Sequence, residues 1–513
     1  MELGAEKEYV GISAIYQFVG NGVQLVSGSL FYIFAARIFD QSDMGVIALF
    51  IAIVGLFGII FTLGLNNAIT HFISSNLNSR VYSPGKTVLR ILVIGMIIAG
   101  LGSAVLFVLS PYISILFLKS LKYEIYVKLL ALVLFGNILF SILNGAIIGF
   151  ERFRASAMIS VVIWVIYYFG ALGLAYTHHT LISIIYGWIL GLILGILVSG
   201  SYVLGILARG YMRRTQRVVG SRTIFTYSLP LLLSSLLGYG AGYTDRFVVT
   251  YLMNTTYLGI YNFSILIMSG IGFISIPFNN ITLPKFSEFY GNNNRQDIKE
   301  NVGAATLLLS YFYVPVALGI AALAPMILYY IAGPQYITGQ YALIILMFVP
   351  GMFISQNVLT QAISSVRKTS IFLYSTLASL IANIIISFSL IPFLGLIGAA
   401  LGLSSTSAVT FLILYRLARR ENIVKFYFYG IAKIWVAALV MFLTVFISMH
   451  LLVRIYGYNV EIMGILIVAG AVFFVLITRV MKIFNEEQKE YILGMFPESM
   501  GYLKKILRML VLS

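Results

Sequence analysis

The chain alternates between long apolar stretches and short polar loops. Each stretch approaches or exceeds the ~20 residues that a helix needs to cross the hydrocarbon core of a bilayer. The pattern therefore predicts an all-α polytopic membrane protein with fourteen spans. Their predicted cores are 11–36, 45–74, 88–118, 126–150, 156–176, 181–207, 224–252, 258–284, 302–331, 341–364, 371–391, 396–417, 430–453 and 461–481.

The pattern of the first half returns in the second half. Asp43-Met44-Gly45-Val46 corresponds to Tyr257-Leu258-Gly259-Ile260, which lies 214 residues later. Asn66-Asn67 and Asn279-Asn280 follow these segments at nearly the same spacing. A duplicated membrane bundle is typical of transporters, whose substrate path runs between the two copies.

Six predicted spans belong to each copy, and two further helices follow the second copy. Because six is even, both copies begin on the same side of the membrane, as parallel repeats related by an axis along the membrane normal. The predicted parts are an N-terminal six-helix lobe (1–210), a basic cytoplasmic linker (211–223), a C-terminal six-helix lobe (224–420), two additional transmembrane helices (421–482) and an amphipathic cytoplasmic tail (483–513).

Composition supports the membrane interpretation and excludes some chemistry. The chain has 513 residues, of which 60% are hydrophobic and 10% charged, and a soluble protein of this size could not bury so much apolar surface. The absence of cysteine rules out disulfides, thiolate metal sites and cysteine nucleophiles. No other metal-ligand, cofactor or catalytic pattern stands out, so we expect no metal, no cofactor and no enzymatic activity.

The net charge of +16 invites a nucleic-acid interpretation, but the basic residues are scattered over short loops. With the N-terminus in the cytoplasm, most of them fall on the inner side, as the positive-inside rule requires. We therefore expect a multi-pass plasma-membrane protein with both termini cytoplasmic, no nucleic-acid partner and a monomeric state. The cations left outside are Arg37, Lys119, Lys122, Lys128 and Arg454.

Several predicted spans carry polar side chains at helical spacing. Side chains that face lipid are apolar, so a polar stripe marks a face toward protein or water. Any one such residue is better explained by helix–helix packing, whereas several parallel stripes favour a hydrated cleft that binds sugars. The candidate sugar-binding residues are Gln17, Asn21, Gln24, Asn67, His71, Tyr239, Tyr243, Gln356 and Asn383.

Asp245 and Arg246 are the clearest charges within a predicted span. An unpaired charge there costs at least about 2.5–3.5 kcal/mol, so it suggests a function. Mutual neutralisation is the structural alternative, but adjacent helical residues point about 100° apart. We predict that both residues take part in substrate binding. Arg37, at the outer end of the first span, suits either the membrane interface or the site.

Four short motifs carry a family resemblance. Phe34-Ala35-Ala36-Arg37-Ile38-Phe39 precedes Asp43-Met44-Gly45-Val46, and Asp245-Arg246-Phe247 precedes Leu258-Gly259-Ile260-Tyr261. In this order the chain resembles the polysaccharide and oligosaccharide flippases, which share a superfamily with multidrug and toxin extrusion transporters and peptidoglycan lipid-precursor flippases.

The resemblance implies two lobes in a V shape, alternating access and a cationic cavity for a lipid-linked sugar phosphate. Arg246, Asp245 and Arg37 match positions where that family places charge. This chain has few other cations within its spans, which leaves open whether the substrate carries one phosphate or two.

These observations favour a flippase that moves a polyprenyl-(di)phosphate-linked oligosaccharide from the inner to the outer leaflet, for polysaccharide or glycoprotein biosynthesis. The alternative is a cation-coupled multidrug extruder, which would need an acidic, aromatic pocket. Asp245 is the only clearly intramembrane acid, and it adjoins an arginine. A membrane-embedded glycosyltransferase would need catalytic acids and usually a large outer loop, whereas all the predicted outer loops are short.

Overall fold

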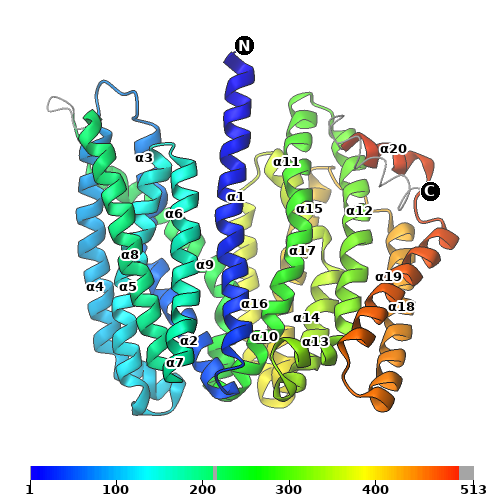
Figure 1. The fold of residues 1–513 in the computed structure, drawn as a ribbon. Coiled ribbons are helices and arrows are strands. Elements are labelled where there is room, and N and C mark those ends of the chain that lie inside the picture. Colours follow the sequence, from blue (N-terminus) through cyan, green and yellow to red (C-terminus); the bar gives the residue numbers. More distant parts are fainter. Residues whose placement is uncertain (1, 212–216, 496–513) are drawn as a thin grey trace. The chain divides into compact units, whose positions relative to one another are not determined.

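The computed structural model describes residues 2–211 and 217–495, and this part of the chain is almost entirely helical (Figure 1). The expected all-α membrane architecture is confirmed. The α-helices are α1 (Glu2–Ala35), α2 (Gln41–Thr62), α3 (Leu65–Ser74), α4 (Pro84–Leu118), α5 (Glu124–Gly149), α6 (Phe153–Val165), α7 (Ala171–His178), α8 (Leu181–Ile206), α9 (Ser221–Leu252), α10 (Thr255–Ile271), α11 (Ser275–Gly291), α12 (Arg295–Ala322), α13 (Ala324–Ile331), α14 (Gln340–Met352), α15 (Ser355–Ser365), α16 (Ile371–Leu394), α17 (Leu396–Arg420), α18 (Phe428–Tyr456), α19 (Val460–Met481) and α20 (Glu486–Met495).

Twelve helices among the described residues are long and apolar enough to cross a membrane, or thirteen if the bent pair α14–α15 forms one span. Val19–Ala35 of α1 is a further, shorter apolar segment. Each predicted core coincides with a helix or with consecutive helices, so the predicted fourteen spans agree broadly with the structure.

The second predicted core of each copy is interrupted rather than continuous. Between α2 and α3, Leu63 and Gly64 both adopt the left-handed conformation, with φ of 50° and 69°. A side chain at Gly64 would lie 2.8 Å from the carbonyl oxygen of Ser228, so the break also allows α9 to approach closely. In the second copy, the short 3-10 turn Gly272–Ile274 separates α10 from α11.

The helices group into two compact units. Unit 1 comprises Met1–Tyr239 and Asn254–Gly259. Within it, α5 packs between α4 and α8, while α6 packs against α1 and α8 (Figure 1). Close packing depends on small residues: a Cβ on Gly191 of α8 would come within 2.8 Å of the Tyr167 backbone.

Residues at the start of α4 form hydrogen bonds with the last part of the predicted linker. Ser83 accepts a hydrogen bond from the Lys86 amide as the N-cap of α4, and its own amide donates to the Arg217 carbonyl at 2.9 Å. Arg217 in turn donates to the Val81 carbonyl at 2.8 Å. The side chain of Arg90 reaches the Val219 carbonyl at 3.0 Å. Hydrogen bonds to α4 therefore hold the residues just before α9 in place within unit 1.

Unit 2 comprises Gly240–Met253 and Ile260–Ser513. Within it, α16 packs against α17, α17 against α14, and α11 against α15. The two additional helices pack on each other, and α18 also packs along α12. The predicted amphipathic tail is described only as far as α20, which lies against α12; the rest of that prediction concerns residues outside the described part.

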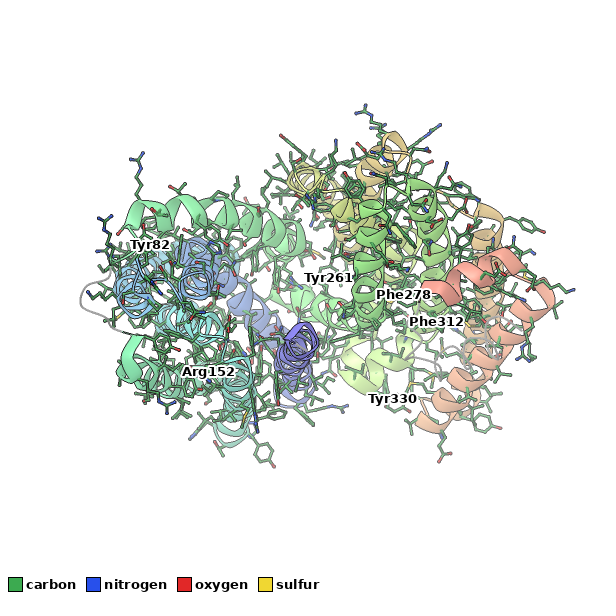
Figure 2. The ribbon with its side chains drawn as sticks, turned by 90° about the horizontal axis from the view of Figure 1, so that it is seen from above. Tyr82, Arg152, Tyr261, Phe278, Phe312 and Tyr330 are labelled. Atoms are coloured by element: carbon green, nitrogen blue, oxygen red, sulfur yellow. The ribbon has the colours of Figure 1, made fainter. Side chains whose placement is uncertain are left out.

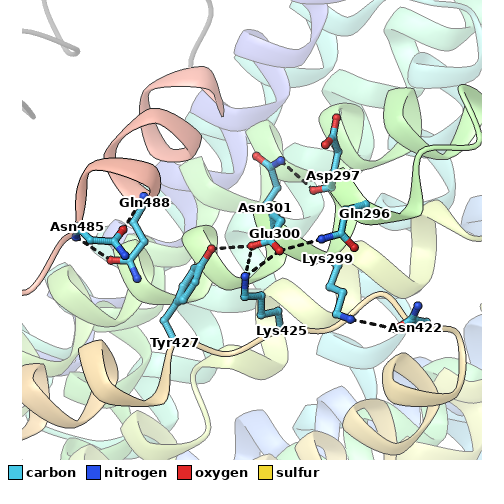
Figure 3. A network of polar contacts seen from close by, with 10 residues as sticks. All are labelled: Gln296, Asp297, Lys299, Glu300, Asn301, Asn422, Lys425, Tyr427, Asn485 and Gln488. Carbon is cyan, nitrogen blue, oxygen red and sulfur yellow. Dashed lines mark hydrogen bonds and ion pairs between the residues drawn. The ribbon is translucent and has the colours of Figure 1, made fainter.

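A buried carboxylate connects α12 to the segment that precedes α18 (Figure 3). Glu300 accepts hydrogen bonds from the Lys425 ammonium at 2.6 Å and the Tyr427 hydroxyl at 2.8 Å. Gln296 donates to the other oxygen of the carboxylate at 3.0 Å. Gly303 permits this approach, because a Cβ there would lie 2.9 Å from the Lys425 carbonyl. We call this group the Glu300 clamp.

Candidate functional site

The predicted charges Asp245 and Arg246 lie two helical turns before the end of α9, in unit 2. Asp245 is fully buried, and only 8% of Arg246 is exposed. The guanidinium of Arg246 donates to the Gly242 carbonyl at 3.1 Å, and its central carbon lies 3.9 Å from the centre of the Tyr243 ring. The cation is therefore stabilised by its own helix through a hydrogen bond and a cation–π contact.

Tyr261 of α10 is a member of this group that the sequence analysis did not select. Its side chain, which is labelled in Figure 2, is fully buried. Its hydroxyl lies close enough to the Asp245 carboxylate to interact with it. The sequence contained a usable signal, because Tyr261 ends the repeated Leu-Gly-Ile-Tyr motif.

Asn383 of α16 lies nearby in the fold but is occupied with packing. Its side-chain amide donates to the Ala241 carbonyl of α9 at 3.0 Å, and its oxygen accepts from the Ser387 hydroxyl at 2.9 Å. The residue is fully buried. These contacts favour the helix-packing interpretation of Asn383 over direct contact with a sugar.

The stripe on α1 belongs to unit 1 and is partly engaged with α6. The amide of Gln17 donates weakly to the Ser156 hydroxyl at 3.4 Å, and Ser156 donates to Asn144 of α5 at 2.8 Å. Asn21 is exposed and Gln24 is half-buried. The polar stripe therefore joins helices at one end and presents accessible amides further along.

Asn67 and His71 are both exposed on one face of α3. The imidazole of His71 stacks on the ring of Tyr227 from α9, with centroids 4.4 Å apart and an angle of 8° between the planes. This face of α3 therefore combines an amide, an imidazole and an aromatic ring in unit 1, a set of groups that can hydrogen-bond and stack on a sugar.

The remaining candidates are Tyr239, Gln356 and Arg37. The hydroxyl of Tyr239 donates to the Ala52 carbonyl of α2 at 2.7 Å, which ties α9 to α2 within unit 1. Gln356 is half-buried at the start of α15 in unit 2. Arg37 is exposed, just after α1.

The first turns of α2 and α10 cross at two glycines in equivalent positions of the repeat, both within unit 1. A Cβ on Gly45 would overlap the carbonyl oxygen of Thr255, and a Cβ on Gly259 would overlap that of Gln41. Each glycine thus meets the same carbonyl of the other copy. The Ser42 and Thr255 hydroxyls share a hydrogen bond of 2.9 Å. We call this contact the glycine crossing.

A groove of about 370 Å³ lies in unit 2 between α12, α18 and α19. Its lining is almost wholly apolar; Phe312, Pro315, Met441 and Phe474 are examples. It offers few hydrogen-bonding groups to a sugar, and its chemistry suits an alkyl chain.

Within the described ranges, no group of three or more histidine, cysteine or acidic side chains is placed so that it could hold a metal ion. The structure thus collects the predicted residues into two sets. Asn67, His71 and the α1 stripe belong to unit 1, while Asp245, Arg246, Tyr243 and Asn383 belong to unit 2.

The fold of these two units is that of known membrane transporters. It matches the structure titled "Lipid II flippase MurJ, inward closed conformation" with a TM-score of 0.68 at 14% identity, covering 92% of this chain and 98% of the other. It also matches an inward-facing multidrug resistance MATE family transporter of the MOP superfamily, with a TM-score of 0.64 at 14% identity over 79% of this chain and 98% of the other.

The sequence then defines the family more narrowly. The chain belongs to the polysaccharide biosynthesis protein family, whose model matches residues 34–339. It is 22% identical over 438 residues to the "Probable low-salt glycan biosynthesis flippase Agl15" of Haloferax volcanii, covering 84% of this chain and 88% of the relative. It is also 24% identical over 421 residues to the "Uncharacterized membrane protein MJ1375" of Methanocaldococcus jannaschii, covering 78% and 95%. The family resemblance noted in the sequence is confirmed.

Proposed function

We propose that this protein is a flippase that moves a polyprenyl-phosphate- or diphosphate-linked oligosaccharide from the inner to the outer leaflet. The observation that carries the proposal is membership of the polysaccharide biosynthesis family over residues 34–339. The relative Agl15 is named as a glycan biosynthesis flippase, and the structural neighbour MurJ as a lipid II flippase. The product would serve polysaccharide or glycoprotein biosynthesis.

The physical task explains why such a protein is needed. A hydroxyl-rich, charged headgroup cannot cross hydrocarbon unaided, because each unsatisfied polar group costs several kcal/mol there. The polar faces of α1 and α3 would supply hydrogen bonds to the sugars, and the prenyl chain would stay in lipid. A membrane potential that is negative inside would favour outward movement of the anion by about 2.3 kcal/mol per charge per 100 mV.

In this proposal the two repeats act as the two lobes of an alternating-access transporter, 1–210 and 224–420, joined by the linker 211–223. The helices of 421–482 support the second lobe, and both termini face the cytoplasm of a plasma membrane. The protein acts without a cofactor or a catalytic step, and as a monomer.

Arg246 is the proposed partner of the substrate phosphate. In the described conformation its guanidinium is occupied by Gly242 and Tyr243, so the phosphate would replace these contacts when α9 becomes accessible. Asp245 is fully buried, which argues against the alternative of a multidrug extruder with an open acidic pocket.

The test is a proteoliposome assay with lipid-linked oligosaccharide in one leaflet and detection of the headgroup in the other. We expect Arg246→Ala to slow translocation about 10- to 100-fold, because hydrogen bonds to charged groups contribute about 1.5–3 kcal/mol and each ~1.4 kcal/mol is a factor of ten. Arg246→Lys should retain part of the rate, since it keeps the charge.

Arg222→Ala is the matched control, because Arg222 is an exposed arginine at the start of the same helix. Its rate should equal that of the wild type. Full activity of Arg246→Ala would refute the phosphate assignment. Translocation no faster than in empty liposomes, with monophosphate and diphosphate donors and with a potential imposed, would refute the flippase proposal itself.

A further inference from the structure

Tyr227 of α9 is an aromatic residue that the sequence analysis did not select. Its ring forms a parallel stack with the imidazole of His71 from α3, with centroids 4.4 Å apart and an angle of 8° between the planes. Tyr227 is 36% exposed, and His71 is also exposed. Because each ring covers one face of the other, this exposure comes from the outer faces and edges of the pair, which are open to a ligand. We call the pair the His71–Tyr227 stack.

Helix packing alone does not account for the stack. The opposite side of α3 is apolar and buried, with Leu65 and Ile69 as examples, and it packs against α4 and α5. Phe72, which is only 9% exposed, meets the Tyr227 ring edge-on at 5.5 Å. Phe72 therefore supplies the buried contact between α3 and α9, whereas His71 adds a polar ring on the side that packing leaves open.

Hydrogen-bonding groups flank the stack on both helices. Asn67 lies one turn before His71 on α3, and Thr223 lies one turn before Tyr227 on α9; both are exposed. Four residues rise about 6 Å along a helix, which is comparable to the width of one pyranose ring. In a membrane protein such polar side chains face protein or water rather than lipid, so this surface suits a hydrated cleft.

The chemistry of this surface distinguishes a sugar from the other parts of a lipid-linked oligosaccharide. The C–H bonds on one face of a pyranose are attracted to the negative face of an aromatic ring. Its hydroxyls can bond to an amide and an imidazole, which both donate and accept hydrogen bonds. A prenyl chain would leave these polar groups unsatisfied, and a phosphate would be repelled by the same negative ring face.

We propose that the His71–Tyr227 stack is a subsite for one pyranose unit of the transported headgroup, with Tyr227 as a residue that determines sugar specificity. A sugar ring that presents an unbroken C–H face would stack here, whereas an axial hydroxyl on that face would hold the rings apart. The inference rests on the proposed flippase function and adds where the sugar is recognised, namely within unit 1.

The location of the stack fits the proposed direction of transport. Helix α3 ends at Ser74, and α9 begins at Ser221, close to the basic linker. In the proposed orientation both of these helix ends face the cytoplasm, so a headgroup that enters from the inner leaflet would meet the stack early. Both rings belong to the same compact unit, so the subsite would stay intact during the transport cycle.

The first test reads sugar binding without transport. The chain has four histidines, so nuclear magnetic resonance of protein with isotope-labelled histidine gives four imidazole signals, and His71→Gln identifies one of them. The probes are the methyl β-glycosides of glucose, galactose and N-acetylglucosamine, added to the full chain in lipid nanodiscs, which carry no sugar. We expect at least one glycoside to shift the His71 signal and to leave those of His178, His179 and His450 unchanged. Sorbitol, which has hydroxyls but no ring face, should have no effect.

Variants of Tyr227 separate the ring from the space that it fills. Tyr227→Phe keeps the ring and should retain the shift, whereas Tyr227→Leu keeps apolar bulk and should lose it. Tyr202→Leu is the matched control, because Tyr202 of α8 is 37% exposed in the same unit; it should behave as the wild type. Absence of a shift with every glycoside, an equal shift with sorbitol, or an undiminished shift in Tyr227→Leu would overturn the subsite.

The second test measures translocation in proteoliposomes as a function of donor concentration. We expect Tyr227→Leu to raise the half-saturating concentration about 2- to 10-fold, the size of an aromatic stacking contact, with an unchanged maximal rate. An unchanged half-saturating concentration, with or without a lower maximal rate, would leave Tyr227 a structural role only and would overturn the subsite. Glycoside binding at His71 together with absent translocation by the wild type would instead count against the flippase proposal.

Discussion

At the scale of single residues, the polar side chains within the spans divide by what they contact. Asn383 and Gln17 bond to neighbouring helices, whereas Asn21, Asn67 and His71 are exposed. Both kinds recur at helical spacing, because helix packing and substrate binding each place polar groups on one face. Exposure in the folded structure separates the two roles.

Asn383 gives a prediction at this scale. Asn383→Ala removes the hydrogen bond to Ala241 and should lower the free energy of unfolding by about 1 kcal/mol, the size of interhelical hydrogen bonds in membranes. Thermal unfolding in detergent measures the effect. Asn21→Ala removes an exposed amide and should leave stability within about 0.5 kcal/mol; equal losses in both variants would show that Asn383 has no special packing role.

The sequence pointed to Asp245 and Arg246 but could not tell their situations apart. A charged residue within an apolar span can be recognised in a sequence, and its position around the helix follows from the helical period. The sequence does not show which side chain of a neighbouring helix lies opposite the charged residue. The hydroxyl of Tyr261 is close to Asp245 because α10 packs against α9 at this point. Tyr261 was therefore missed as a site residue.

At the scale of elements, the structure differs from the sequence prediction mainly at the breaks within spans. The apolar pattern of 45–74 is continuous, and it predicts one helix. The structure ends α2 at Thr62 and begins α3 at Leu65, because Leu63 and Gly64 take left-handed backbone conformations. Hydropathy detects the length of an apolar segment but not its backbone angles. Glycine adopts the left-handed conformation at this break at little energetic cost.

The glycine crossing gives a prediction at the scale of elements. The chain has no cysteine, so Ser42→Cys together with Thr255→Cys introduces one defined pair where two hydroxyls now lie 2.9 Å apart. We expect oxidation to cross-link this pair and to stop translocation, and a reductant to restore it. Adding Gly259→Ala should lower the cross-linked fraction, because the new methyl group would overlap the Gln41 carbonyl.

Ser42→Cys alone is the control for this experiment, since it has no partner to react with. Unimpaired translocation by the fully cross-linked protein would mean that the crossing does not open during transport. Unchanged cross-linking in the Gly259→Ala background would mean that α2 and α10 do not depend on the glycine for their approach.

At the scale of the whole molecule, the count of spans and the two-copy arrangement were readable from the sequence, because both depend on long-range repetition of apolar length. The sequence did not show how the two additional helices attach to the rest of unit 2. This attachment depends on the Glu300 clamp, in which Glu300 lies more than a hundred positions before its partners Lys425 and Tyr427 in the chain (Figure 3).

Glu300→Gln tests that attachment. Loss of the charge should weaken the contacts to Lys425 and Tyr427 and lower the free energy of unfolding by about 1–3 kcal/mol, toward the lower end because the Lys425 side chain is 37% exposed. Hydrogen exchange of residues 421–427 should become faster. Glu288→Gln, which breaks an exposed pair with Lys285, is the control and should change neither quantity; an equal change there would remove the special role of the clamp.

The glycine crossing also carries information about ancestry. Its reciprocal form, in which each glycine meets the carbonyl of the other copy, is the form of an isologous dimer interface. Two identical short chains could have met in this way before one gene held both. In the fused chain the same contact is encoded twice, so a side chain gained in one copy would collide with backbone contributed by the other. A substitution at Gly45 and one at Gly259 would therefore disturb the same contact.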